Sequence, residues 1–298
     1  SPGAAVAVGA FDAHMGAVGT EITEGTLVKI LGTSCCDMAV APPHVIGGKL
    51  VAGICGQVDG SIIPGMIGLE AGQSAYGDVY AWFKNVLMWP LETMLPRARA
   101  MAEAGRKAAR KAREEIEQKM VKRLSEAAAD LVTDDTVPLA LDWLNGRRTP
   151  YADQRLKGAL LGLSLGTSAV GIFKALVEST AYGAKAIIDR FGEEGIRFDQ
   201  VAASGGIPKK SPYVMQVLSD VLNLPVKVAE SEQAGALGAA MFAAVAAGVH
   251  RTVREAQAKM GNGFSTIYRP DPGRAARYAE LYSRYREVGG LLEEHLRK

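Results

Sequence analysis

Short apolar runs and Gly-rich turns alternate over the first 70 residues of the chain. Ala4–Phe11 is an apolar run that ends at Asp12, and Thr26–Leu31 is a second run bounded by Gly on both sides. Residues 42–68 are rich in Gly and Pro, with short apolar pieces between them. The pattern predicts two strands joined by a turn, followed by hairpins and loops.

Helical spacing of apolar residues appears in four later segments. Gln73–Trp89 has this spacing, and Pro90 is expected to end the helix. Residues 157–190, Ala234–Ala247 and Tyr278–Leu296 are the other three segments. The 157–190 segment has a face of small residues, made of Gly158, Gly162, Gly166, Ala169 and Gly171. Small residues of this kind predict close packing against a neighbouring helix.

The region from residue 198 to residue 229 gives the most informative local pattern. Phe198–Ser204 predicts a strand, and Gly205–Lys210 predicts a loop. Ser211 is a candidate N-cap for a helix over Tyr213–Leu222, and Pro225–Ala229 predicts the next strand. Strand, Gly loop, helix and strand in this order are the repeating unit of an α/β sheet.

Composition places the chain among ordinary globular proteins. Of 298 residues, 48% are apolar and 22% are charged, with a formal net charge of +2. This charge excludes a strong field for nucleic acid or for a membrane surface. Three Cys cannot build a disulfide framework, which favours a reduced, cytoplasmic setting. The apolar runs fall short of the roughly 18 residues of a membrane span, and no secretory pattern is visible.

Residues 96–126 differ from the rest of the chain in charge. They carry ten Lys or Arg and five Glu, and apolar residues recur at helical spacing among them. A solvated amphipathic helix on the surface is the main interpretation. A helix that binds nucleic acid or anionic membrane is the alternative, although no aromatic residue lies among the charges to stack on bases.

Three Gly-containing turns follow predicted strands, and such turns expose backbone N–H groups that favour a phosphate. They are Gly32–Ser34, Gly205–Gly206 and Gly166–Ser168. A purely structural turn is the alternative for each of them. The fingerprints of P-loop and Rossmann proteins do not occur in the sequence.

Two carboxylates are candidates for chemistry. Asp12 follows a predicted strand near a Gly turn, where it could deprotonate a hydroxyl during phosphoryl transfer; a helix cap or a solvated Asp is the alternative. Glu70 lies in a predicted loop flanked by Gly, either as a solvated residue or as a hydrogen-bond acceptor for a polyol. His14 is interpreted as structural. The four His and three Cys show no zinc spacing, so no metal ligands are predicted.

Six motifs in a fixed order resemble the FGGY family of carbohydrate kinases. They are Phe11–His14, Leu31–Cys35, Gly68–Asp78, Leu141–Arg147, Ala203–Gly206 and Ala236–Ala240. The resemblance covers about residues 5–286. Residues 69–73 make the L-ribulokinases the most similar members of the family.

The resemblance implies an actin-like, ribonuclease H-like α/β fold, in which the sugar and ATP lie between two such domains. It assigns Asp12 as the base that takes the proton of the sugar hydroxyl, and Glu70 as an acidic sugar ligand. Ser211 stands where relatives often place an Asn near the adenine. The nucleotide positions that it implies are Gly32 and Thr33 at the γ-phosphate, Gly77, the pair Gly205 and Gly206, and Ser211.

The resemblance also implies a reaction and its partners. The expected reaction is phosphorylation of a ketopentose, L-ribulose to L-ribulose 5-phosphate, by ATP with Mg²⁺. The chain, residues 1–298, resembles the C-terminal domain, with a helical insertion at about 90–135. An earlier domain that supplies much of the sugar pocket is expected to be missing, with the start at Ser1 interpreted as a cut, so the isolated chain is expected to be inactive. A homodimer is left open.

Two alternatives remain beside this interpretation. The chain could be a nucleotide-binding module with a sugar-kinase fold and no kinase activity. It could also belong to another FGGY kinase, one that acts on D-ribulose or xylulose.

Overall fold

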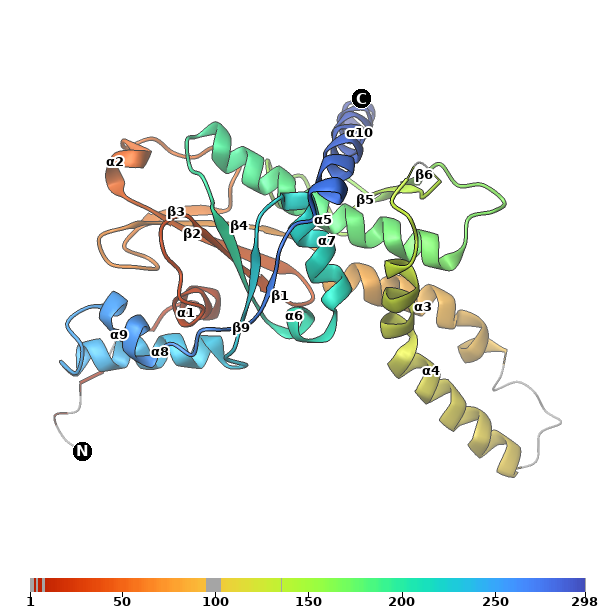
Figure 1. Cartoon of the computed structure of the whole chain (residues 1–298), viewed down its shortest axis with the longest axis horizontal. Coiled ribbons are helices and arrows are strands. Elements are labelled where there is room, and N and C mark those ends of the chain that lie inside the picture. Colours follow the sequence, from red (N-terminus) through yellow and green to blue (C-terminus); the bar gives the residue numbers. More distant parts are fainter. Residues whose placement is uncertain (1–2, 4, 7–8, 95–102, 135, 298) are drawn as a thin grey trace.

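A seven-stranded sheet forms the centre of the chain (Figure 1). The computed structural model describes residues 3, 5–6, 9–94, 103–134 and 136–297. The strand order is β3-β4-β2-β1-β7-β8-β9; β1, β7 and β8 are parallel, and the other neighbours pair antiparallel. The strands are β1 (Thr26–Leu31), β2 (Cys35–Ala41), β3 (Gly56–Asp59), β4 (Ile67–Gln73), β7 (Gln200–Ser204), β8 (Val226–Ala229) and β9 (Phe264–Tyr268), with β5 (Leu139–Leu141) and β6 (Ala159–Leu161) in a separate two-stranded sheet.

Helices cover both faces of the large sheet (Figure 1). They are α1 (Asp12–Gly19), α2 (Pro43–Ile46), α3 (Gly77–Thr93), α4 (Glu103–Ala129), α5 (Ala169–Glu193), α6 (Gly206–Lys210), α7 (Pro212–Leu222), α8 (Ala234–Ala246), α9 (Val253–Met260) and α10 (Pro272–Arg297). Alternating side chains of β1 divide the core into two parts. Leu27 and Leu31 pack with α3, α5, α7 and α10, whereas Val28 and Ile30 pack with α1, α8 and α9.

Two glycines set the distance between α1 and α8. A Cβ on Gly19 would lie 1.9 Å from the Ala234 carbonyl oxygen, and one on Gly238 would lie 1.9 Å from the Met15 carbonyl oxygen. The two backbones therefore touch directly. The two helices therefore cross in direct contact, and Gly235 in the first turn of α8 also lies near Asp12, since a Cβ there would be 3.7 Å from the Asp12 carbonyl oxygen.

The strand predictions are confirmed at the centre of the sheet and wrong at the start of the chain. Thr26–Leu31 is β1, and the predicted strands around residues 200 and 227 are β7 and β8. Ala4–Phe11 forms no strand in its described part, residues 5–6 and 9–11, while residues 4, 7 and 8 lie outside the described residues. Val6 is 89% exposed and Phe11 is 75% exposed, so no neighbouring strand covers this run. Asp12 consequently begins a helix and does not end a strand.

Two helix boundaries differ from the prediction. α3 continues through Pro90 to Thr93, where the Met94 N–H donates to the Pro90 carbonyl at 2.9 Å and completes the last turn. The 157–190 segment is helical only from Ala169 onward. Gly162 has φ +78°, which breaks a right-handed helix, and its surroundings form β6 and a loop.

The region after β7 differs from the prediction in one respect. Residues 206–210, predicted as a loop, form the short helix α6. The predicted N-cap is confirmed, because the Val214 N–H donates to the Ser211 hydroxyl at 3.4 Å.

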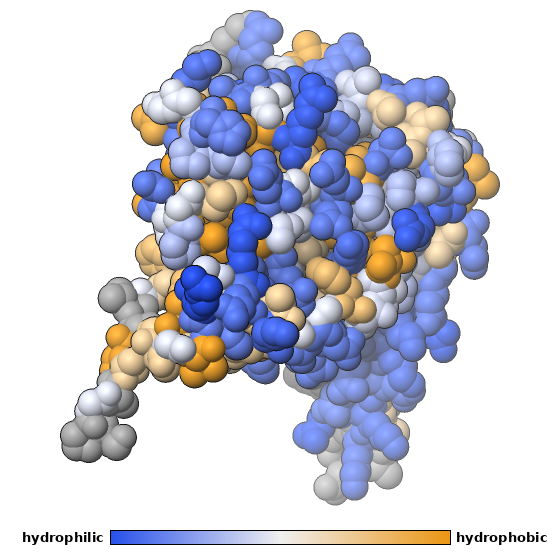
Figure 2. Space-filling model, turned by 60° about the vertical axis from the view of Figure 1, so that its left-hand side comes forward, coloured by the Kyte–Doolittle hydropathy of each residue, from blue (hydrophilic) through white to orange (hydrophobic). Residues whose placement is uncertain are grey.

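The basic segment is a surface helix over the residues that the structure describes. α4 spans Glu103–Ala129 and extends away from the sheet (Figure 1), while residues 96–102 of the predicted segment lie outside the described residues. Its charges form exposed pairs one turn apart, such as Lys119 with Glu115 at 2.6 Å. Hydrophilic side chains dominate the face seen in Figure 2. No described helix is long and apolar enough to cross a membrane. The insertion at 90–135 stays a prediction.

Candidate functional site

A groove of about 340 Å³ lies at the carboxyl ends of β1 and β7. α1, the turn between β1 and β2, and the start of α8 form its walls. It brings together four residues that the sequence analysis selected, namely Asp12, Gly32, Thr33 and Gly205. Ligand sites of open α/β sheets characteristically lie outside the carboxyl ends of parallel strands.

The β1–β2 turn is held by hydrogen bonds to the start of α3. The N–H groups of Tyr76 and Asp78 donate to the Thr33 carbonyl at 2.8 and 3.1 Å, and the Gly77 N–H donates to the Gly32 carbonyl at 3.1 Å. A Cβ on Gly77 would lie 2.6 Å from the Gly32 carbonyl oxygen, so the close approach needs glycine. Gly77 therefore supports the turn from behind and does not line the groove.

A buried ion pair supports the same turn from the sheet. The Lys29 ammonium lies 2.6 Å from the Asp37 carboxylate, both side chains are fully buried, and the Cys35 thiol donates to the same oxygen at 3.0 Å. Burial alone would lower the pKa of Lys29, but the interactions with Asp37 and Cys35 together outweigh it and the pKa is raised. Lys29 is therefore charged at neutral pH, and the β1–β2 hairpin is fixed across its width.

Gly205 brings the end of β7 against the end of β1. Its φ is +101°, and a Cβ there would lie 2.4 Å from the Leu31 carbonyl oxygen. Only glycine satisfies both conditions without strain. Gly206 follows as the first residue of α6, and a Cβ on it would meet nothing within 4 Å. Gly205 is thus required for a tight turn, whereas Gly206 lies beside open space.

Asp12 reaches the groove from the first turn of α1. Its side chain is exposed, and its Oδ1 accepts the Ala13 N–H at 2.8 Å. The Gly235 position on α8 lies close to it, since a Cβ there would be 3.7 Å from the Asp12 carbonyl oxygen. Glu232, just before α8, is the second carboxylate that lines the groove.

Glu70 lies on strand β4, not in the predicted loop, and is half-buried. Its Oε1 accepts a hydrogen bond from Arg148 Nη2 at 2.6 Å, and its Oε2 lies 3.8 Å from His14 Nε2. Glu70 does not line the groove, but His14 is two residues from Asp12 on α1. The contact places the two candidate carboxylates on neighbouring elements.

Arg148 and Cys36 are site residues that the sequence analysis did not select. Arg148 follows the Leu141–Arg147 motif by one position, which was the available signal. Cys36 lines the groove, and Arg148 Nη1 lies 3.9 Å from its sulfur. Burial raises the pKa of the Cys36 thiol, although Arg148 opposes the shift. The thiol is therefore protonated at neutral pH, which excludes it as the nucleophile of the groove.

Ser211 lies apart from the groove. It lines a separate cavity of about 550 Å³ between α4, α7 and α10, together with Lys174 and Tyr213. The Tyr213 hydroxyl is buried there and has no hydrogen-bond partner among the described residues. Within the described part of the chain, no three His, Cys, Asp or Glu side chains are grouped to hold a metal ion.

Comparison with known proteins identifies the family of the chain. Residues 27–247 match the sequence profile of the C-terminal domain of the FGGY family of carbohydrate kinases. The chain belongs to this family. It is 51% identical to a ribulokinase from Vibrio parahaemolyticus over 292 residues, which cover 98% of this chain and 50% of that protein. A ribulokinase from Geobacillus thermodenitrificans is 39% identical over 96% of this chain and 48% of its own length. The FGGY chain thus spans about half the length of the curated relatives that it matches.

Solved structures of FGGY proteins share the fold. The xylulose kinase from Rhodospirillum rubrum superposes with a TM-score of 0.75 at 20% identity, over 96% of this chain and 51% of that chain. The Plasmodium falciparum glycerol kinase with ADP gives a TM-score of 0.66 at 16% identity, over 93% and 50%. These neighbours confirm the expected actin-like, ribonuclease H-like fold. The profile match over residues 27–247 confirms the resemblance to the family's C-terminal domain.

Proposed function

We propose that this chain is the nucleotide-side domain of a ribulokinase, which transfers the γ-phosphoryl group of ATP to L-ribulose. The observation that carries the proposal is the groove, which gathers Asp12, the Gly32–Thr33 turn and Gly205 at one end of the sheet. The 51% identity to a ribulokinase supports the substrate. Another ketopentose, D-ribulose or xylulose, is the alternative substrate.

The proposed mechanism uses one base and several positioning groups. The 5-hydroxyl oxygen of L-ribulose attacks the γ-phosphorus, the bond from that phosphorus to the β–γ bridging oxygen breaks, and ADP leaves. Asp12 takes the hydroxyl proton, a role that its exposed carboxylate at the groove fits. Gly32 and Thr33 hold the γ-phosphate, and Gly205 and Gly206 lie along the phosphates and adenosine. Glu70 accepts hydrogen bonds from the sugar.

Two further contacts in this proposal concern the nucleotide. Ser211 would approach the adenine from its separate cavity, and Gly77 would act through the turn that it supports. Beside the proposed base, Glu232 is the other carboxylate of the groove, and one carboxylate together with phosphate oxygens would make a donor set that Mg²⁺ accepts. Bound Mg²⁺ supplies neutralisation of the charge on the phosphates.

The candidate base at the groove, Asp12, is exposed to solvent. Phosphoryl transfer to a sugar requires both substrates to be oriented and water to be excluded. We therefore propose that a second actin-like domain closes over the groove and supplies further sugar contacts. The chain is proposed to act in the cytoplasm.

A fusion protein tests the proposal. The chain would be joined to the half of the V. parahaemolyticus ribulokinase that it does not match, and ADP release would be followed with L-ribulose and MgATP. We expect turnover by the fusion and none by the chain alone. Asp12→Asn in the fusion should lower transfer by about 10²-fold or more and leave MgATP binding unchanged, whereas Asp130→Asn, at an exposed carboxylate outside the groove, serves as the matched control.

The outcomes separate the alternatives. Turnover by the isolated chain would contradict the need for a second domain. Transfer that survives Asp12→Asn would show that another group is the base. MgATP binding without transfer in the fusion would favour a nucleotide-binding module without kinase activity.

A further inference from the structure

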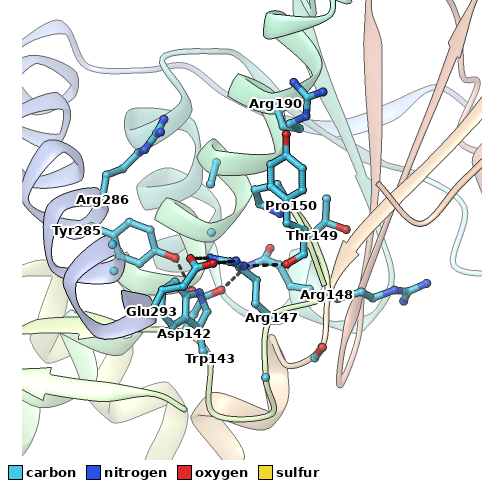
Figure 3. Close-up of a pocket in the computed structure, with 18 of the residues that line it drawn as sticks. Asp142, Trp143, Arg147, Arg148, Thr149, Pro150, Arg190, Tyr285, Arg286 and Glu293 are labelled. Atoms are coloured by element: carbon cyan, nitrogen blue, oxygen red, sulfur yellow. Dashed lines mark hydrogen bonds and ion pairs between the residues drawn. The ribbon is translucent and has the colours of Figure 1, made fainter. Parts of the chain in front are cut away.

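A second cavity, of about 400 Å³, lies among α5, α10 and the loop that follows β5 (Figure 3). Its volume falls in the range of small-molecule pockets. Gln73 at the end of β4 belongs to its lining, on the core face that β4 shares with Leu69 and Ala71. Glu70 is an odd number of positions away from Gln73 and points to the opposite face. The cavity is therefore separate from the groove of the candidate active site.

The floor of the cavity is built from buried hydrogen-bond acceptors. Asp142 accepts from the Tyr285 hydroxyl at 2.7 Å and from Gln73 Nε2 at 2.9 Å. Gln73 Nε2 also donates to the Thr180 carbonyl at 2.9 Å, which fixes the orientation of the amide. Gln73 Oε1 is then left buried without a partner among the described residues. A buried acceptor without a donor is costly, and a ligand hydroxyl would satisfy it.

A glycine permits this floor. A Cβ on Gly183 of α5 would lie 2.2 Å from Asp142 Oδ2 and 2.6 Å from Gln73 Nε2. The absence of a side chain lets α5 approach the Asp142–Gln73 pair. The α5 backbone therefore packs directly against the pair, and Gly183, Asp142 and Gln73 together line the cavity.

The walls consist of aromatic rings and arginines whose charges are largely neutralised. Arg147 donates to both carboxylate oxygens of Glu293 at 2.7 and 2.9 Å and lies 5.1 Å from the centre of the Trp143 ring (Figure 3). Arg190 pairs with Glu193 at 2.7 Å and lies over the Tyr151 ring. Apolar ring faces beside paired charges suit a ligand with C–H faces and hydroxyl groups better than a strongly charged one.

One arginine at the rim differs from the others. Arg286 lies on the exposed side of α10 and borders the cavity, on the opposite side from Arg190 (Figure 3). It forms no ion pair with the residues that the structure describes. Its interaction with the Tyr282 hydroxyl lowers the pKa of that group, against the larger rise caused by burial. An anionic group on a ligand would meet Arg286 at the entrance, while the hydroxyls reach the floor.

We propose that this cavity binds a small polyhydroxylated molecule, either a free monosaccharide or its phosphate ester. Asp142 and Gln73 Oε1 accept the ligand's hydroxyl protons. Trp143 and Tyr151 contact its C–H faces. Arg286 contacts the phosphate where the ligand carries one. The site is independent of the proposed transfer reaction, because none of these residues belongs to the groove.

Calorimetric titration of the purified chain tests the site with three probes, namely L-ribulose, L-ribulose 5-phosphate and ribitol. The deciding variant is Gly290→Leu. A Cβ at Gly290 meets nothing within 4 Å, so leucine would fill the cavity, and it favours the helix more than glycine does. Ala279→Leu is the matched control, exposed on the same helix and outside the lining.

We expect at least one probe to bind with millimolar or tighter affinity, and Gly290→Leu to weaken it tenfold or more. Ala279→Leu and Asp12→Asn should leave the affinity unchanged, and Asp12→Asn separates this site from the groove of the proposed kinase. The site is a sugar-phosphate site if L-ribulose 5-phosphate binds more tightly than L-ribulose, and if this preference is lost in Arg286→Ala but kept in Arg284→Ala. Equal affinities for the two probes would identify a site for the free sugar. Absence of binding by all three probes, or binding that Gly290→Leu leaves intact, would overturn the proposal.

Discussion

Asp142 is a buried carboxyl group whose hydrogen bonds come from neutral donors. Burial raises its pKa above the ordinary value of 3.8, while Tyr285 and Gln73 partly oppose the shift. The folded protein therefore holds this proton more tightly than the unfolded chain does. A raised pKa of this kind makes a single side chain a source of pH-dependent stability.

The sign of that dependence follows from linkage. The contribution of Asp142 is complete below pH 3.8 and is lost as the pH rises through its folded pKa. Asp142→Asn replaces the titrating carboxyl group by a neutral amide. The difference in unfolding free energy, original chain minus variant, should therefore fall as the pH rises from the acid range toward neutrality. Urea unfolding at a series of pH values measures it, with Asp130→Asn on the surface as the control. A difference that is constant with pH would contradict the assigned shift.

The positions of the glycine turns could be predicted from the sequence, whereas some other residues of the site could not. Gly32 and Gly205 follow strands that are readable as apolar runs, so a turn at those positions could be expected. Arg148 could not be assigned from its own neighbourhood, because its partner Glu70 lies 78 positions away in sequence. Its contact depends on how the loop crosses β4, which only the tertiary structure shows.

At the crossing of α1 and α8, the two backbones lie too close together for a side chain to be added. Gly238→Ala would place a Cβ 1.9 Å from the Met15 carbonyl oxygen, and the backbone there cannot move aside cheaply. We expect a loss of about 1–3 kcal/mol in the free energy of unfolding, as for other overpacked contacts. Denaturant unfolding measures the loss.

Gly235→Ala is the matched control for this prediction. It lies on the same helix, and its Cβ would make an ordinary contact of 3.7 Å with the Asp12 carbonyl oxygen. Alanine there should be neutral or stabilising, since glycine in a helix costs about 0.5–1 kcal/mol relative to alanine. Equal effects of the two variants would contradict the assigned contact.

Some strands of the sheet could be predicted from the sequence and others could not, and burial explains the difference. β1, β7 and β8 are central parallel strands, and such strands appear as continuous apolar runs. β2 and β4 were missed because they carry Asp37, Glu70 and two glycines within their spans. Asp37 is acceptable inside the sheet only because Lys29 of β1 lies opposite it, a pairing that becomes known once the register is known.

At the scale of the whole molecule, the groove and the cavity on the other face should respond separately to ligands. MgATP bound in the groove stabilises the folded state by mass action, by about 2.7 kcal/mol at a concentration 100 times its Kd. We expect this increase in the isolated chain and a smaller one in a Gly205→Ala variant. The Gly290→Leu variant should keep the full increase. Thermal and denaturant unfolding with and without MgATP measure it, and no stabilisation of the original chain would contradict nucleotide binding by the groove.

Arg147 and Arg148 are neighbours in the chain, yet one pairs with Glu293 on α10 and the other with Glu70 on β4. A single peptide bond therefore joins an anchor on the C-terminal helix to an anchor beside the proposed sugar position. The short loop that carries the two arginines thus fastens the last helix of the chain to β4 through two charged hydrogen-bonded pairs.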